Sequence, residues 1–379
     1  MLQPSLPPLR VWVWTAATVA LVVVAALLWR GSDAAATEST TAAPADVPTG
    51  TPAGAVSEAW ATDGGPLPES VVESGRVLVG GPHGLRALDP LTGDEAWHYT
   101  RSNARLCGLT ATNGVAVAVF ATENRCDEAV ALNAGTGVRA WTRSILLRGD
   151  AQLDSTDRIV LATSPTGLVT LDPTGNNIRW RYAAPDGCRI TDSDVGSSGV
   201  AVLQQCGDAV QLRLLDGFTG DGHWTRDLPA ADVADVRLLG ADRLLGVLVG
   251  DEVQALSADD GALRQRLPAD ADVQQLSFGA VALFRTGDAL SALDAASGAL
   301  LWEAPAVGLP SAPVIDKDQD AAAPGLLLVP DEDGFAHRDP ATGAELDRSA
   351  VSGLQPGGLA EGVGPVVIYR LPDQVLGYR

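Results

Sequence analysis

The sequence predicts an all-β protein: an eight-bladed β-propeller of four-stranded blades, closed by N- and C-terminal strands and preceded by one transmembrane helix. Three observations predict this architecture. A short phrase that ends in tryptophan returns about every forty residues. Runs of β-forming residues alternate with Gly, Asn and Asp turns. A charge-free apolar stretch precedes the first repeat.

The first 55 residues divide into three segments. Residues 1–10 form a short tail, which we expect to be cytoplasmic. Residues 11–29 are nineteen residues without a charge between Arg10 and Arg30, a length that can cross a bilayer, with tryptophans near both ends. The alternative is a cleaved signal peptide with Ala34-Ala-Ala36 as its processing site, although the apolar stretch exceeds a typical signal core. Residues 30–55, rich in Ala, Thr, Pro and Gly, predict a flexible linker.

Residues 56–379 carry the repeats. In five copies a tryptophan lies eight residues after an Asp or Asn, with a Thr-Gly or Ser-Gly turn between them; the tryptophans are Trp97, Trp141, Trp180, Trp224 and Trp302, and the turn glycines are Gly93, Gly137, Gly220 and Gly298. The third copy has Asn176 at the glycine position. Gly and Asn tolerate the positive φ of such a turn. A tryptophan has an apolar face that one sheet cannot bury alone, so we expect it to dock on the next sheet.

Each repeat predicts four strands. In the copy that ends at Trp141, they cover residues 106–111, 115–120, 129–132 and 138–142, with a polar turn at 121–128. Two weaker copies keep the frame but have Gln265 and Asp347 in place of the tryptophan.

The two ends of the array complement each other. Trp60 belongs to a fourth strand with no first three before it, and after Asp347 the chain offers only three strands, near 358–360, 365–369 and 374–378. Pairing these parts gives seven whole blades and one split blade. Such a ring of eight has no open edge at its ends.

Charge and cysteines indicate the compartment. The net charge of −21 argues against nucleic acid as a partner, because phosphate binding needs basic patches. Abundant Ala and Gly and a single lysine, Lys317, indicate a GC-rich bacterial genome. Three pairings of the four cysteines are formally open; aligning the repeats favours Cys107–Cys126 and Cys188–Cys206. Structural disulfides indicate an oxidising, extracytoplasmic setting.

The phrase Ala-x-Asp-x-x-Thr-Gly-x-x-x-Trp, from Ala87 to Trp97, resembles the tryptophan-docking motif of the PQQ-like, quinoprotein-type propellers. The resemblance covers about residues 56–379. That family includes quinone-dependent alcohol dehydrogenases, which hold a quinone and a calcium ion in the central channel and usually carry a disulfide between adjacent cysteines. It also includes non-catalytic members such as the propeller lipoprotein of the outer-membrane barrel-assembly machinery.

The sequence contains little evidence of a catalytic, cofactor-binding or metal-binding site. It has no adjacent cysteines, and no residue matches a catalytic or quinone-binding position of the dehydrogenases, so we predict no catalytic residue and no cofactor. His83, His98, His223 and His337 lack metal-ligand spacing. Asp316, Asp318 and Asp320 begin like a calcium loop. The residues at the sixth and twelfth positions of that loop depart from the pattern, and a solvated hairpin turn explains the run equally.

We therefore expect a single-pass membrane protein whose propeller lies on the extracytoplasmic side and binds a protein partner of the cell envelope. Rigid rings that display loops suit this role. The alternative is a quinone-dependent oxidoreductase or a sensor of a small ligand.

Overall fold

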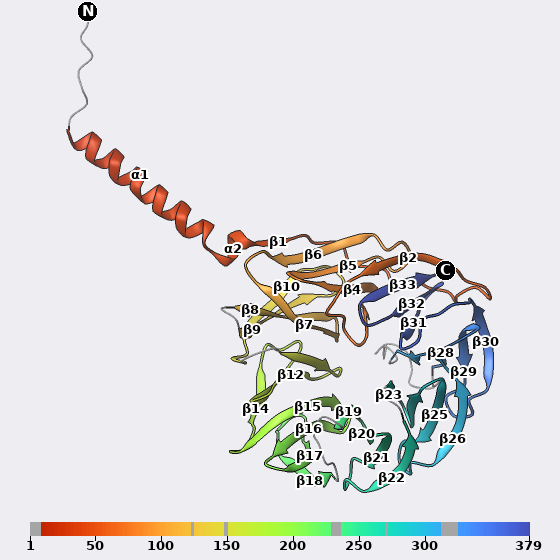
Figure 1. Cartoon of the computed structure of the whole chain (residues 1–379). Helices are drawn as coiled ribbons and strands as arrows, with labels where there is room; N and C mark the ends of the chain where they lie inside the picture. Colours follow the sequence, from red (N-terminus) through yellow and green to blue (C-terminus); the bar gives the residue numbers. More distant parts are fainter. Residues whose placement is uncertain (1–8, 123–124, 148–150, 229–235, 270–271, 312–324) are drawn as a thin grey trace, which may run out of the picture.

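The computed structural model describes residues 9–122, 125–147, 151–228, 236–269, 272–311 and 325–379. It confirms the predicted fold class: eight antiparallel sheets stand in a ring, and one apolar helix projects from it (Figure 1). First strands of neighbouring blades contact one another, as β7 does with β11 and β15 with β19. The first strand of each blade is therefore innermost and the fourth lies at the rim.

Blades 2 to 6 are four-stranded sheets in chain order. Blade 2 contains β7 (Arg105–Thr112), β8 (Val115–Thr122), β9 (Arg125–Asn133) and β10 (Arg139–Ser144). Blade 3 contains β11 (Gln152–Ser155), β12 (Val160–Ser164), β13 (Gly167–Leu171) and β14 (Ile178–Ala183). Blade 4 contains β15 (Cys188–Gly196), β16 (Gly199–Cys206), β17 (Ala209–Leu215) and β18 (Gly222–Leu228). Blade 5 contains β19 (Val236–Ala241), β20 (Leu244–Val249), β21 (Glu252–Ser257) and β22 (Leu263–Pro268). Blade 6 contains β23 (Val273–Phe278), β24 (Val281–Thr286), β25 (Ala289–Asp294) and β26 (Leu300–Pro305).

The remaining three blades lie around the junction of the chain ends. Blade 1 contains β3 (Val72–Glu73), β4 (Arg76–Gly81), β5 (Gly84–Leu88) and β6 (Glu95–Arg101). In the described residues blade 7 contains β28 (Leu327–Asp331), β29 (Gly334–Arg338) and β30 (Glu345–Ala350). Blade 8 contains β31 (Leu359–Val363), β32 (Val366–Arg370), β33 (Gln374–Tyr378) and the N-terminal strand β2 (Glu58–Asp63). A short strand, β27 (Leu309–Pro310), pairs in parallel with β31.

Ring closure follows the prediction. β2 pairs antiparallel with β33, and Trp60 lies opposite Gly377. Ser57 and Arg379 exchange two backbone hydrogen bonds at the end of this pair. An N-terminal and a C-terminal strand therefore complete one sheet, and both edges that an open array would expose are paired.

In the described residues, docking tryptophans join six of the eight pairs of neighbouring blades. The indole Nε1 of Trp97 donates to the Ala134 carbonyl at 2.9 Å, and that of Trp141 donates to the Pro173 carbonyl at 2.9 Å. The same bond recurs from Trp60, Trp180, Trp224 and Trp302 to Pro90, Gly217, Ala258 and Pro340. Each acceptor is a backbone carbonyl in the next blade. It belongs to the residue directly after the Asp, Asn or Ser that begins the turn between the third and fourth strands.

The turn glycines leave room for these indoles. A Cβ on Gly137, whose φ is 75°, would lie 2.7 Å from Cδ2 of Trp97. Gly93 and Gly220 face Trp60 and Trp180 in the same way, and Asn176 adopts the positive φ predicted for it. Gly298 differs, because it faces Arg264 rather than a tryptophan; blade 5 has Gln265 at the tryptophan position. Two glycines of the weaker copies, Gly261 and Gly343, receive Trp224 and Trp302.

Both predicted disulfides are present, with Cα–Cα distances of 6.0 Å for Cys107–Cys126 and 4.1 Å for Cys188–Cys206. Cys188 and Cys206 lie directly opposite each other in β15 and β16. Cys126, in contrast, lies in β9, the third strand of blade 2, because the β8–β9 hairpin continues through most of the turn predicted at 121–128.

The segment expected to be a flexible linker is partly structured. The helix α1 (Leu9–Arg30) is followed by a short helix α2 (Asp33–Ala36) and the strand β1 (Thr37–Ser39). β1 pairs antiparallel with β6 and makes blade 1 a five-stranded sheet. Composition alone indicated a coil, but the outer edge of β6 offers unpaired backbone groups that a passing strand can satisfy.

Candidate functional site

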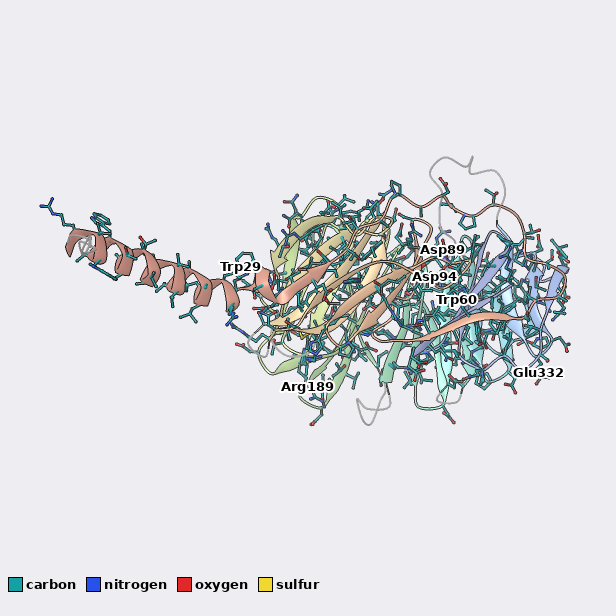
Figure 2. All side chains as sticks on the ribbon, turned by 90° about the horizontal axis from the view of Figure 1, so that it is seen from above. Trp29, Trp60, Asp89, Asp94, Arg189 and Glu332 are labelled. Carbon is teal, nitrogen blue, oxygen red and sulfur yellow. A yellow bond between two sulfur atoms is a disulfide. The ribbon has the colours of Figure 1, made fainter. Side chains whose placement is uncertain are left out.

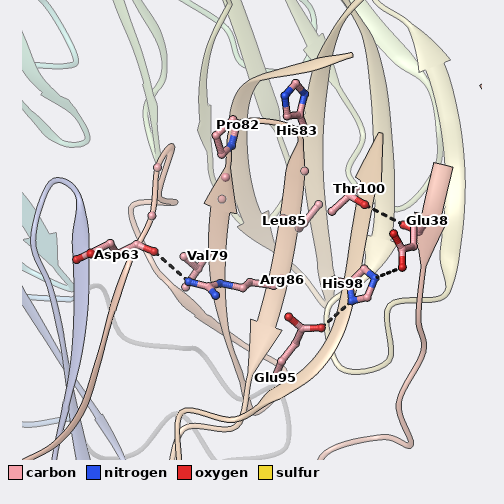
Figure 3. Close-up of a pocket in the computed structure, with 15 residues that line it drawn as sticks. Glu38, Asp63, Val79, Pro82, His83, Leu85, Arg86, Glu95, His98 and Thr100 are labelled. Atoms are coloured by element: carbon pink, nitrogen blue, oxygen red, sulfur yellow. Dashed lines mark hydrogen bonds and ion pairs between the residues drawn. The ribbon is translucent and has the colours of Figure 1, made fainter. Parts of the chain in front are cut away.

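An open groove with a volume of about 740 Å³ lies on one face of blade 1, beside blade 8 (Figure 3). Two cross-strand rows form its floor. One row joins Val79, Arg86 and His98, and the other joins Gly81, Gly84 and Thr100 and reaches Glu38 of β1. The groove thus crosses from β4 to β1, three strand spacings or about 14 Å.

The groove exists because this blade junction lacks a side chain that the other junctions have. In seven of the eight blades the residue four positions after the docking tryptophan, or after the residue that replaces it, donates its backbone N–H to the neighbouring hairpin. At the other junctions this residue has a side chain that is at least half-buried: Ile145, Leu228, Ala306 and Arg101 are buried, and Ala184, Ala269 and Val351 are half-buried. Gly64 stands there in blade 8, and its N–H donates to the Asp373 carbonyl at 2.9 Å.

Glycines also shape the far side of the groove. Gly65 donates its N–H to the Gly80 carbonyl at 3.0 Å, and a Cβ on Gly80 would lie 2.2 Å from the Pro66 oxygen. Gly80 is therefore needed for the close approach of the 64–66 loop. Gly81 is different: the nearest heavy atom to a Cβ there is 3.8 Å away, so its position faces the open groove.

Charged side chains line the rim of the groove. Glu38 and Glu95 flank His98, with Glu95 2.6 Å from Nδ1 and Glu38 4.0 Å from Nε2. Arg86 is held inside, since its Nη2 donates to the Thr62 hydroxyl and to the Asp63 carbonyl. Figure 3 shows Asp63 at one end and Glu38 at the other, with Arg86 between them.

Carboxylates also gather on the innermost strands of blades 3 and 4. Desolvation, together with repulsion from the charges of Glu69 and Asp192, raises the pKa of Asp154 in β11 to about 7. Desolvation likewise raises the pKa of Asp194 in β15, with added repulsion from Asp154 and Glu69. At neutral pH the carboxyl groups of Asp154 and Asp194 are therefore harder to ionise together than isolated carboxyl groups.

Another buried carboxylic acid, Glu361, lies on β31 of blade 8. Glu361 is 9% exposed, and the Ser70 hydroxyl donates to it at 3.3 Å. Burial raises its pKa to about 8.

The other predicted site residues do not meet in a reaction centre. Asp316, Asp318 and Asp320 lie outside the described residues. Within the described ranges, no three His, Cys, Asp or Glu side chains are arranged to hold a metal ion. His83 and His98 line the same groove, but His83 Nδ1 is engaged by the Ala104 carbonyl at 2.8 Å. The docking tryptophans and glycines build the ring rather than the groove.

One protein family matches most of this chain. A family model described as outer membrane protein assembly factor BamB, of the PQQ-like repeat class, matches residues 26–202 and 208–364. This chain belongs to that family. A search of curated protein sequences finds no significant match.

Solved structures share the propeller at low sequence identity. BamB from Moraxella catarrhalis is 14% identical with a TM-score of 0.51, over 86% of this chain and 99% of that one. A computationally designed protein, Ika8, is 12% identical with a TM-score of 0.53, over 81% and 94%. The quinohemoprotein alcohol dehydrogenase from Comamonas testosteroni is 11% identical with a TM-score of 0.50, over 85% and 76%. At these identities the likeness shows the fold alone.

Sequence reasoning missed the groove. One signal was present: Gly64 is the single glycine at a position where other repeats have residues with side chains, such as Ile145 and Leu228. The contribution of β1 to the rim had no comparable signal, because its residues lie outside the repeats.

Proposed function

We propose that this chain is a membrane-anchored, extracytoplasmic propeller that acts as a non-catalytic, protein-binding scaffold of the cell envelope. The observation that carries the proposal is the family match over both halves of the ring, from residue 26 to residue 364, to a model described as an assembly factor. Repeat rings present many loops on a rigid frame, which suits binding of protein partners.

The helix α1 supports membrane anchoring. Its residues Arg10–Arg30 have a mean hydropathy of 2.4, and none of them is buried against the propeller. Figure 2 shows the helix leaving one side of the ring, with Trp29 near the propeller end. A helix that is apolar all round and uncovered fits a lipid environment. The two disulfides support placement of the ring on the oxidising side.

Three experiments on the full-length chain test this function. Photocrosslinking in native membranes, followed by mass spectrometry, is expected to recover a defined envelope protein. N-terminal sequencing of the mature protein is expected to find residues 1–30 retained. Reconstitution with pyrroloquinoline quinone and calcium is expected to give no dye reduction. Turnover in that assay would contradict the scaffold function, and cleavage near Ala36 would contradict the anchor.

A further inference from the structure

We propose that the groove on blade 1 binds an extended, positively charged peptide segment of a partner protein. The proposal rests on the scaffold function above and assigns a surface to it. The groove is lined by Val79 and by the backbone of five glycines, Gly64, Gly65, Gly80, Gly81 and Gly84. A Cβ on Gly65 or Gly81 would lie no closer than 3.8 Å to any heavy atom, so these two positions are open. A ligand can therefore approach the sheet closely.

The dimensions of the groove favour a chain segment. Three strand spacings, about 14 Å, equal the rise of about four residues of extended chain. The groove is open along this length rather than enclosed, and one wall is the end of β2 of blade 8. A strand-like segment laid across the sheet face would occupy it from β4 to β1.

The charges at the rim of the groove favour a positively charged ligand. Glu38, Glu95 and Asp63 carry three carboxylates, and the side chain of Glu38 is 82% exposed. Arg86 is the single Lys or Arg among the lining residues, and it already donates within the groove wall. Because carboxylates lie at both ends, a segment with basic residues about four positions apart is complementary to it (Figure 3).

The net charge of the chain adds to this selection at long range. A net charge of −21 attracts cationic segments from a distance and repels acidic ones. Steering of this kind raises the rate of encounter, whereas the groove geometry decides where the segment is held.

A fluorescent pentapeptide, Lys-Leu-Ala-Leu-Lys, tests the proposal by anisotropy with the full-length chain in detergent. Gly81→Leu fills the open position and is expected to weaken binding at least about tenfold. Gly54→Leu is the matched control, since a Cβ on Gly54 meets no heavy atom within 4 Å and Gly54 lies away from the groove. We expect Gly54→Leu to bind like the wild type. Equal affinity of the Gly81→Leu and wild-type chains would overturn the proposal.

A second variant changes the charge of the rim without filling the groove, so its effect does not depend on packing inside the groove. Glu38→Lys is expected to weaken binding about fivefold. Asp208→Lys, at an exposed turn of blade 4, makes the same charge change and is expected to have less than about a twofold effect. Equal binding of Glu-Leu-Ala-Leu-Glu would show that the rim does not select cations and would overturn the inference.

The experiments distinguish failure of the groove proposal from failure of the scaffold function. A crosslinked envelope partner that the Gly81→Leu chain retains leaves the scaffold standing and removes the groove from it. Peptide binding that depends on Gly81, with no envelope partner found by crosslinking, supports the groove and counts against the scaffold function.

Discussion

At the scale of single residues, the ring depends on one contact repeated around it: an indole of one blade against a turn of the next. The indole N–H bonds are between 2.7 and 3.1 Å in all six cases. The seventh repeat, which ends at Asp347, lacks its tryptophan for a structural reason. Blade 8 is split between the chain ends, so it offers no Thr-Gly turn on which a tryptophan of blade 7 could dock.

Gly137→Ala should destabilise the ring more than an equivalent change elsewhere. Alanine at φ 75° costs about 1–2 kcal/mol, and its Cβ would lie 2.7 Å from Trp97, which adds about 1–3 kcal/mol of overpacking. Gly250→Ala is the control, because its φ of 62° is also positive but no heavy atom lies within 4 Å of a Cβ. Urea unfolding should show the larger loss for Gly137→Ala; equal losses would mean that the indole contact does not restrict this position.

Glu361 should make the stability of the fold depend on pH. Its pKa is about 8 in the folded chain and near 4.5 when unfolded. The folded state thus binds more protons between these values, and its stability falls as pH rises from about 5 to 8, by roughly 2–5 kcal/mol. The turn aspartates Asp172 and Asp216 oppose this at low pH, because turn N–H bonds lower their pKa and their stabilisation is lost on acidification.

Glu361→Gln should therefore melt at a higher temperature than the wild type at pH 8, and at nearly the same temperature at pH 5. Thermal unfolding across this range measures the difference. If the wild type and the variant show parallel melting curves at every pH, the buried carboxyl does not control the pH dependence.

At the scale of elements, the strand β1 ties the helix to the ring. Arg101, which is 1% exposed, forms an ion pair with Asp33 at 2.9 Å and a second with Glu128. Ser102 donates its N–H to the Ala36 carbonyl at 2.9 Å, and Thr40 donates to the His98 carbonyl at 2.9 Å. Since β1 also carries Glu38, the segment that follows the helix completes the groove.

Arg101→Met should loosen this segment. Loss of the charged contact to Asp33 removes about 1–2 kcal/mol of local stabilisation, so the amides of residues 37–42 should exchange with deuterium about fivefold faster or more. Arg158→Met serves as the control, because its ion pair with Asp157 is exposed on both sides. Unchanged exchange at residues 37–42 in the Arg101→Met chain would show that backbone pairing alone holds β1.

Local patterns predict the repeating elements well and the exceptional ones poorly. Most blades are recognisable in the sequence from a Gly turn, a tryptophan or both, because those residue types meet local requirements of φ and burial. β1 was not predictable, since Thr37-Glu-Ser becomes a strand only because β6 lies beside it. The groove was not predictable either, because it depends on Gly64, Gly80 and Gly81 meeting across two blades.

At the scale of the whole molecule, the N-terminal region performs three tasks within about fifty residues. It forms the apolar helix, adds β1 to blade 1, and supplies β2 to blade 8. Val56 also donates its N–H to the Ala350 carbonyl of blade 7 at 3.0 Å. The junction of blades 7, 8 and 1 is therefore built from both ends of the chain, and the groove lies within this junction (Figures 1 and 3).

Two truncations separate ring closure from the rest of the N-terminal region. A chain without residues 1–54 loses α1 and β1 but keeps β2, whereas a chain without residues 1–63 also loses β2 and the contact of Trp60 with Gly93. Removing that strand exposes the edge of β33 and costs at least about 3 kcal/mol for the indole. The longer truncation should then melt roughly 5–10 °C lower and over a broader range. Calorimetry of both chains measures this, and coincident transitions would show that the ring does not depend on closure through β2.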